Sequence, residues 1–259
     1  LDLVNKRNEY LKKYALKTGK MVWQSAEIKD ARAIPGIYVT DDKVILQVGG
    51  QVELQYVQRT KNPDGSFTIT NNIEMENVKP VNVQCFNAIT GEQLWESEKM
   101  KKGMTNLFLS GSNAIVCSGK ALYSLDIATG KENYEKALKE DNVGLADLII
   151  DYNDQVIIIG EKGVSSRKKS DGSYVGSSKF KKSTPVSHNG QIIYGGRSLA
   201  LCTSNNDYAV YDLTTMKYKN YDARKGASAY LSDDGLSLMV LESGGMIRKS
   251  KVTLLDTTK

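Results

Sequence analysis

An all-β fold made of repeated four-stranded antiparallel sheets is predicted by two recurring patterns and by the strand content between them. The first pattern is a Thr-Gly turn followed four residues later by a large aromatic residue, and the second is a polar turn followed by an apolar strand. Each repeat holds about four short strand-like runs separated by turn residues, and none shows a convincing helical period. Four strands in about 40–50 residues are typical of one blade of a β-propeller.

The Thr-Gly pattern recurs along the chain. It stands as ALKTGKMVW at Ala15–Trp23, returns as NAITGEQLW ending at Trp95, and weakens to LDIATGKENY, where Tyr134 takes the place of Trp. The marker residues of this ladder are, in order, Gly19, Gly91, Gly130, Gly172 and Met216. Their spacings of 72, 39, 42 and 44 residues indicate a period near 42 with one long unit.

A polar turn before an apolar strand, as in TDDKVILQV and SDDGLSLMVL, gives a second ladder. The predicted strand-opening residues are Lys43, Asn113, Gln155, Gln191 and Leu236, with spacings of 70, 42, 36 and 45 residues. Chance does not easily produce two ladders in step. Because Asp41-Asp42 and Asp233-Asp234 fall in matching turns of this ladder, they are interpreted as turn residues rather than calcium ligands.

The Thr-Gly turn has a predicted mechanical role. Glycine adopts a positive φ at little cost, so the third strand of a blade can turn into the fourth. The aromatic residue then lies on the outermost strand, where a flat ring can pack over the turn of a neighbouring blade. The predicted docking residues are Thr18, Gly19, Trp23, Thr90, Gly91, Trp95, Thr129, Gly130 and Tyr134.

The whole chain, 1–259, is predicted to form one propeller domain. Its repeat units are expected near 1–25, 26–97, 98–136, 137–178, 179–221 and 222–259. The first and last units read as partial blades, so we expect part of a six- to eight-bladed ring. The alternative is a ring closed by a blade that both termini share. The strands within 179–221 stay open, because this stretch has room for one strand more than a blade needs.

The long second unit contains a predicted β-hairpin insertion at 51–76. QVELQYVQRT and SFTITNNIEME read as its strands, and Pro63-Asp64-Gly65 is a strong turn signal between them. An apolar side is expected from Tyr56, Phe67, Ile69 and Ile73. Such a hairpin is either a decoration without function or a partner-binding element, which can also pair edge to edge with a partner's strand.

The phrase A-x-x-T-G-x-x-x-W at Ala15–Trp23 resembles the tryptophan-docking motif of the pyrroloquinoline-quinone-like (PQQ-like) β-propeller repeat family. The resemblance is specific in two or three units and degenerate in the last three. Within the family, the chain resembles the non-catalytic branch of the outer-membrane assembly lipoprotein BamB. The rival tryptophan-aspartate repeat family is disfavoured, because the sequence has no Trp-Asp dipeptide and its single histidine is His188.

That resemblance implies a scaffold for other proteins, in a bacterial envelope or secretion-related assembly. It implies a periplasmic or cell-surface location, with lipid anchoring through an N-terminus outside this sequence. The alternative function is a cell-surface propeller that binds a ligand or glycan, or acts as a sensor. A sugar platform needs several exposed aromatic side chains on one face, whereas most of the 14 tyrosines fall on repeat strands.

A PQQ-dependent dehydrogenase is the less favoured reading of the same resemblance. Those enzymes need a calcium site, a catalytic Asp and a Trp beneath the quinone, and many carry adjacent cysteines. Here both tryptophans belong to the docking motif, and the cysteines Cys85, Cys117 and Cys202 are widely spaced. His188, in a turn, is a poor candidate for a catalytic triad. We therefore expect no enzyme activity, no cofactor, and no catalytic, cofactor-binding or metal-ligating residues.

Composition limits the partners further. The net charge is +5, but the lysine pairs are scattered, so no nucleic-acid partner is expected. No apolar run approaches the about 18–20 residues of a transmembrane helix, and no transmembrane segment is predicted. The expected partners are other proteins that are associated with a membrane or envelope.

Overall fold

The computed structural model describes residues 10–28, 31–100, 102–180, 192–202, 207–224, 226–245 and 248–258. These residues form strands, turns and loops, and no helix occurs among them. Their contacts divide the chain into two compact units, Leu1–Lys136 and Ala137–Lys259. The two units are described separately.

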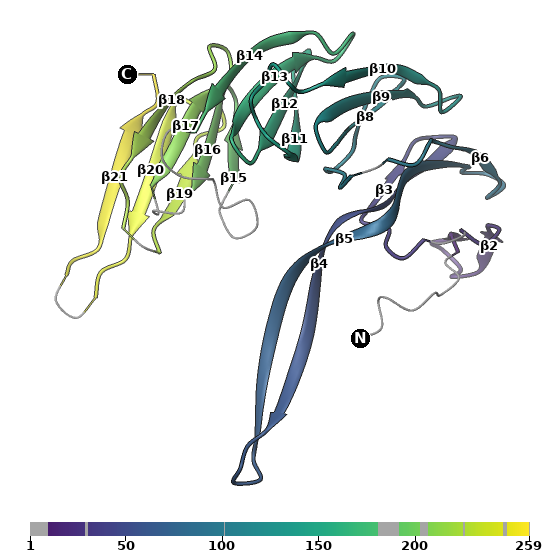
Figure 1. Ribbon diagram of the computed structural model, residues 1–259, viewed down its shortest axis with the longest axis horizontal. Coiled ribbons are helices and arrows are strands. Elements are labelled where there is room, and N and C mark those ends of the chain that lie inside the picture. The colour runs from purple at the N-terminus through teal and green to yellow at the C-terminus, as the bar shows by residue number, and fades with distance from the viewer. Residues whose placement is uncertain are drawn as a thin grey trace. The chain divides into compact units, whose positions relative to one another are not determined.

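The first unit contains one two-stranded and two four-stranded antiparallel sheets (Figure 1). The two-stranded sheet pairs β1 (Lys12–Tyr14) with β2 (Met21–Gln24). The next sheet has the order β3 (Gly36–Val39), β4 (Lys43–Lys61), β5 (Phe67–Asn87), β6 (Gln93–Glu96). The third has β7 (Phe108–Ser110), β8 (Asn113–Ser118), β9 (Ala121–Asp126), β10 (Glu132–Ala137).

The second unit contains two four-stranded sheets and one three-stranded sheet. The first is built from β11 (Ala146–Tyr152), β12 (Gln155–Gly160), β13 (Gly163–Lys168), β14 (Tyr174–Lys179). The second is built from β15 (Ile192–Gly195), β16 (Ser198–Cys202), β17 (Tyr208–Asp212), β18 (Lys217–Tyr221). The three-stranded sheet is built from β19 (Ser228–Leu231), β20 (Ser237–Glu242), β21 (Lys251–Asp256).

Every sheet is formed by strands that follow one another in the chain and pair as antiparallel neighbours. This confirms the predicted all-β class with four-stranded antiparallel blades. The central strands are buried on both faces, as in β16, where Leu199–Leu201 are at most 1% exposed. A sheet buried in this way has a neighbour on each face, so its strands are apolar runs without alternation.

The cores lie between successive sheets. In the first unit, Ile45 and Val83 of the second sheet join Val116 and Leu125 of the third in one buried cluster. In the second unit, Ile157 and Ile159 of β12 join Leu199 and Leu201 of β16. The apolar faces that a single sheet leaves open are thus covered by the next sheet, which is the physical reason for the repetition.

The second sequence ladder was wrong at two places. In each complete sheet a backbone N–H just after the third strand donates to the carbonyl of the residue just before the second strand, as Leu213 does to Arg197 at 2.9 Å. In that sheet the second strand therefore opens at Ser198. The predicted Gln191 lies outside the described residues, just before the first strand, β15. In the last sheet the second strand opens at Ser237, one residue after the predicted Leu236.

The error has a physical cause. Both β15 and β16 are short apolar runs that follow turn residues, and a period of two residues cannot tell a first strand from a second. The described residues of 179–221 hold four strands, β15, β16, β17 and β18, which is the number that one blade needs. Its first part, 191–213, seemed to hold one strand too many, and its described residues do hold β15, β16 and β17. All three belong to one sheet.

A buried ion pair braces the second unit. The Asp141 carboxylate accepts from Nε of Arg167, at 2.9 Å and 3.1 Å to its two oxygens, and from Nη2. The remaining guanidinium donors reach the carbonyl oxygens of Gly172 at 2.7 Å and Ala137 at 3.1 Å. The two side chains are only 5% and 0% exposed. A loop, a strand and a turn are therefore fixed by one side chain whose donors are satisfied.

Arg167→Ala is expected to reduce the free energy of unfolding by about 3–5 kcal/mol, because it leaves the Asp141 carboxylate buried without its partner. The matched control is Arg197→Ala, which removes the half-exposed pair with Asp212 and should cost about 1 kcal/mol or less. Urea unfolding of both variants measures the difference. Equal losses would show that the buried pair stabilises the fold no more than the half-exposed pair does.

Candidate functional site

Five turns between a third and a fourth strand share one backbone geometry. In each, the marker residue donates its N–H to the carbonyl oxygen four residues earlier, at 2.7–3.0 Å, and adopts a φ between +55° and +79°. The donor–acceptor pairs are Gly19–Ala15, Gly91–Asn87, Gly130–Asp126, Gly172–Lys168 and Met216–Asp212. Glycine favours this region of φ, and four of the five marker residues are glycine. Met216 is the exception in residue type, although its φ of +55° lies in the same region.

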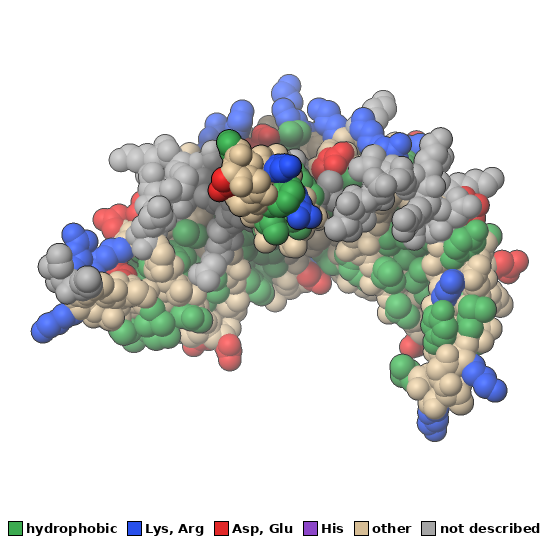
Figure 2. Space-filling model, turned by 90° about the horizontal axis from the view of Figure 1, so that it is seen from below, with side chains coloured by type: hydrophobic (Ala, Val, Ile, Leu, Met, Phe, Trp, Pro, Cys, Tyr) green, Lys and Arg blue, Asp and Glu red, His purple; other side chains and the backbone are tan. Residues whose placement is uncertain are grey.

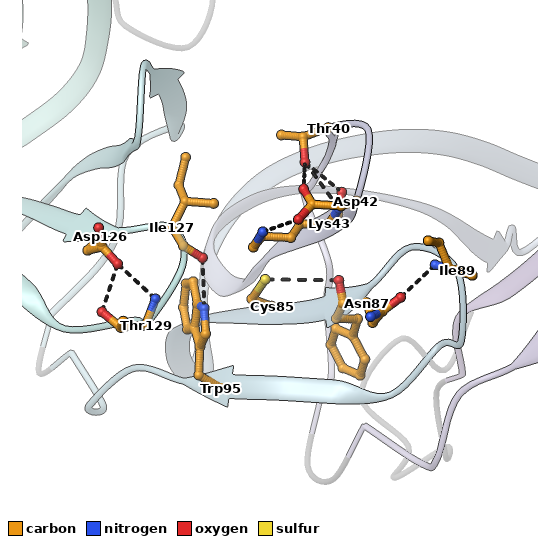
Figure 3. Close-up of polar contacts among 11 residues, drawn as sticks. Thr40, Asp42, Lys43, Cys85, Asn87, Ile89, Trp95, Asp126, Ile127 and Thr129 are labelled. Atoms are coloured by element: carbon orange, nitrogen blue, oxygen red, sulfur yellow. Dashed lines mark hydrogen bonds and ion pairs between the residues drawn. The ribbon is translucent and has the colours of Figure 1, made fainter.

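Short polar side chains hold these turns. Oδ1 of Asn87 accepts the N–H of Ile89, and Oδ1 of Asp126 accepts both the N–H and the hydroxyl of Thr129 (Figure 3). Oδ1 of Asn87 also accepts the N–H of Thr90. The Thr129 hydroxyl, together with its N–H, holds the pKa of Asp126 below its ordinary value. These bonds explain why Asn or Asp opens three of the five turns, whereas Ala15 and Lys168 open the other two. Thr18, in the first turn, accepts from the N–H of Lys20 at 3.4 Å.

Both tryptophans lie over the glycine of the following sheet's turn. Trp95, on β6, donates from Nε1 to the carbonyl oxygen of Ile127 at 2.9 Å (Figure 3), and a Cβ added to Gly130 would lie 2.5 Å from its ring. Trp23, on β2, donates to Ala88 at 3.1 Å and lies equally close to Gly91. Glycine thus serves twice, for its φ and for the close approach of a ring.

The other predicted docking residues differ in their surroundings. Gly19 has the same turn geometry, but nothing lies within 4 Å of a Cβ placed on it. Tyr134 lies on β10 at the position that matches Trp23 and Trp95, and its side chain is buried.

A reciprocal exchange replaces the tryptophan contact in the second unit. Gly176, on β14, stands in the tryptophan column, four residues after Gly172, and Met216 stands in the glycine column of the following turn. A Cβ on Gly176 would lie 3.2 Å from Cγ of Met216, whose backbone oxygen accepts the hydroxyl of Ser178. In this contact the large side chain lies on the turn and the glycine lies on the strand, the reverse of the tryptophan contacts. The sequence ladder recorded Met216 but missed Gly176, although reading both columns together reveals the pair.

A long β-hairpin projects from the second sheet. β4 and β5 pair from Lys43–Asn87 to Lys61–Phe67, whereas β3 pairs only with Val44–Gln47 and β6 only with Gln84–Phe86. The outer part, including 51–76, therefore extends beyond both neighbours (Figure 1). Where it leaves the sheet, a Cβ on Gly49 would lie 1.9 Å from the Pro80 oxygen, so only glycine fits this register shift.

The register divides the hairpin into two faces. Val57 pairs with Asn71, so Val57, Phe67, Ile69 and Ile73 share one face, 47–66% exposed. Tyr56 pairs with Asn72 and lies on the opposite face, so the expected grouping of Tyr56 with Phe67, Ile69 and Ile73 was wrong. The sequence did not single out Val57, because period two gives each strand's faces but not which faces coincide across the turn. We name Val57, Phe67, Ile69 and Ile73 the apolar face.

Charges border the apolar face near the tip. The guanidinium carbon of Arg59 lies 3.9 Å from the ring centre of Phe67, a cation–π contact. Figure 2 shows hydrophobic side chains beside Lys and Arg side chains on the projecting hairpin. The opposite face is polar, with Nδ2 of Asn72 donating to Gln58 at 3.3 Å. The hairpin is thus an amphipathic ribbon.

Metal-ligating and nucleophilic groups are sparse in the described ranges. They contain no group of three or more His, Cys, Asp or Glu residues placed to hold a metal ion, and no helix in them is long and apolar enough to span a membrane. His188 lies outside these ranges. Cys85 and Cys117 are buried and Cys202 is half-buried. Burial raises the pKa of Cys85 to about 11, which keeps it protonated at neutral pH.

Comparison with known proteins agrees with this architecture. A family model described as outer membrane protein assembly factor BamB matches residues 80–215, just over half of the chain. The chain belongs to this family. A search of curated proteins gives no significant match.

Many solved structures are similar to the chain, including the following three. BamB from Moraxella catarrhalis has a TM-score of 0.54 at 14% identity, over 94% of this chain and 67% of that one. The computationally designed Ika8 protein has 0.50 at 13%, over 96% and 91%, and the designed Ika4 protein has 0.51 at 9%, over 76% and 99%. At these identities the likeness shows the fold alone, which is a β-propeller.

Gly130→Ala is expected to destabilise the protein more than Gly19→Ala. Both variants place a Cβ at positive φ, which costs about 1–2 kcal/mol, but only the first drives it into the Trp95 ring, for about 1–3 kcal/mol more. Urea titrations give the free energy of unfolding of each variant. The difference between the two losses is the contribution of the contact between the Trp95 ring and Gly130. Identical losses would mean that the ring does not press on the turn.

The exchanged pair makes a different prediction. Met216→Gly removes a buried side chain and is expected to cost about 2–5 kcal/mol, and Gly176→Trp inserts a ring where Met216 already lies. The double variant should be more stable than the sum of the two losses predicts, because it restores the arrangement of Trp95 over Gly130. A double-mutant cycle measures this coupling. Purely additive losses would contradict the exchange.

Proposed function

We propose that this chain is a non-enzymatic propeller scaffold that binds other proteins in a bacterial envelope or secretion-related assembly, and that its β4–β5 hairpin contacts one of them. The description of the family to which the chain belongs names an outer membrane protein assembly factor, BamB. That description supports a protein-binding role and a periplasmic or cell-surface location. The partner would then be an envelope protein.

The apolar face of the hairpin is the observation that carries this proposal. Val57, Phe67, Ile69 and Ile73 stand exposed on a ribbon that extends beyond its sheet. A two-stranded ribbon alone is marginally stable in water, and its exposed aliphatic side chains gain by being covered. The ribbon grows from a sheet whose core is buried, so a rigid frame presents the binding residues.

A quinone-dependent dehydrogenase is a poorer fit to the same fold. Such an enzyme needs a flat tryptophan beneath the quinone. The chain has two tryptophans, and both rings lie over the glycine turn of a neighbouring sheet with their Nε1 donors bonded to backbone carbonyls. Neither ring is available to line a cofactor.

A glycan-binding role also fits less well. Sugar platforms use aromatic side chains that converge on one surface, whereas the apolar face of the hairpin has one aromatic ring, Phe67, and three aliphatic side chains. Branched aliphatic side chains favour contact with another protein.

The decisive experiment is cross-linking in the native cells with the full-length protein, followed by purification and mass spectrometry. We expect envelope or secretion-machinery proteins linked to the region 51–76. The double variant Ile69→Ser/Ile73→Ser should lower their recovery at least about tenfold, since exposed anchor residues contribute about 2 kcal/mol or more to an interface.

The control is Thr68→Ser/Thr70→Ser on the polar face of the same strand, which should bind normally. Unchanged thermal melting of both variants shows that the propeller is intact. Recovery of the protein alone, or equal losses from both faces, contradicts the proposal.

A further inference from the structure

The outer edge of β5 is unpaired along the hairpin. From Phe67 to Ile73, β5 pairs on one side with β4, and no strand of the described part of the chain pairs with its other side. A free edge presents backbone N–H and C=O groups that are ready to pair with another strand. Natural proteins usually protect such edges with charges, proline or bulges.

The two edges of the hairpin are protected to different degrees. The β4 stretch that faces Phe67–Ile73 is Gln55–Lys61, and it carries the charged residues Arg59 and Lys61. The facing stretch of β5, FTITNNI at Phe67–Ile73, has no charge, no proline and no glycine. It is rich in β-branched residues, which favour strands. The protection that β4 has is therefore missing on β5 alone.

The unprotected stretch is self-complementary. When two copies of Phe67–Ile73 run antiparallel about Thr70, Phe67 stands opposite Ile73 and Thr68 opposite Asn72. These are an aromatic–aliphatic pair and a pair of hydrogen-bonding polar side chains, both of which stabilise neighbouring strands. Thr70 stands opposite itself on the two-fold axis. Ile69 stands opposite Asn71, and no pair within Phe67–Ile73 brings two charges together.

We propose that a second copy of this chain pairs with the free edge of β5, antiparallel and centred on Thr70. The two hairpins then form one four-stranded sheet in the order β4, β5, partner β5, partner β4. Because the contact uses the same segment on both copies, it closes as a two-fold dimer. The apolar faces of the two hairpins become one continuous surface, twice as wide as either alone.

The proposal fits the tip of the hairpin better than insertion into a lipid surface does. The turn is polar and ordered by its own hydrogen bonds, with Asp64 accepting both the N–H and the hydroxyl of Ser66 at 2.9 and 2.6 Å. A segment that enters a membrane does not lead with a carboxylate. An edge of seven residues also buries less than the about 1,200 Å² of stable complexes, so the dimer is weak and forms at high protein concentration.

Disulfide trapping of the purified full chain tests whether Thr70 lies on the two-fold axis of the dimer. Paired residues of antiparallel strands have Cα atoms about 4.5–5.5 Å apart, within reach of a disulfide. Thr70→Cys should therefore form a disulfide-linked dimer on mild oxidation, measured by non-reducing electrophoresis. The control Gln58→Cys pairs with Thr70 inside one hairpin, so in the proposed sheet its two copies lie about 14 Å apart. We expect about tenfold more dimer from Thr70→Cys than from the control or the parent chain.

The register is tested by mixing two variants. Phe67→Cys and Ile73→Cys should link to each other when combined, and poorly to themselves when each is oxidised alone. A parallel arrangement would instead link Phe67→Cys to itself. That result, or equal trapping at positions 58 and 70, overturns the proposal.

A lysine on either strand separates edge pairing from contact between apolar faces. In the Thr70→Cys background, Ile69→Lys should abolish the dimer, whereas Val57→Lys, on the same face but on β4, should leave it. The two side chains are similarly exposed, at 66% and 62%. Loss of the dimer with both variants, or with neither, contradicts edge pairing. Since only purified protein is used, failure here leaves the binding of an envelope partner untouched.

Discussion

The architecture depends on a flat tryptophan ring that lies against the glycine of a turn in the following sheet. Within each unit, successive sheets bury their central strands against one another, so stability requires a fixed contact from sheet to sheet. In the first unit Trp23 and Trp95 supply it, each with its ring over a glycine and its Nε1 bonded to a carbonyl of that turn. The hydrogen bond fixes the orientation of the ring, and the missing Cβ fixes its distance. Interdigitated core side chains fill the space behind this contact.

The parts of this fold that repeat were predictable from the sequence, and the parts that occur once were not. The period near 42, the four-stranded sheets and the turn after each third strand follow from two ladders of residue types. Gln191 was predicted to open a strand, and it precedes the first strand of its sheet. The residues of the same ladder that open second strands are Lys43, Asn113 and Gln155. The ladder could not show this difference, because adjacent short apolar strands look alike without their pairing. In the hairpin, each strand's alternation was visible, but the faces coincide only once the register across the turn is known. That register separates Tyr56 from Phe67.

The protein combines a repetitive frame with one irregular feature. The frame is built from contacts that recur, and its two tryptophans and its Arg167–Asp141 pair hold sheets and turns in place. The hairpin does not follow this repeated pattern, since it extends a strand pair far beyond its neighbours and leaves aliphatic side chains exposed to water. Function in such a molecule is best sought where the repeat is broken, because packing alone does not account for the exception.

The exchange between Gly176 and Met216 changes what should be counted as one repeat. The bulky and the empty position of a docking contact belong to different sheets, yet each has meaning only with the other. The structural unit of this contact is therefore the junction between two sheets, which comprises the outer strand of one sheet and a turn of the next. A profile that scores each blade column by column treats this junction as two unrelated defects. One that scores outer strand and following turn jointly recognises it as intact, and would detect degenerate blades that the tryptophan signature alone passes over.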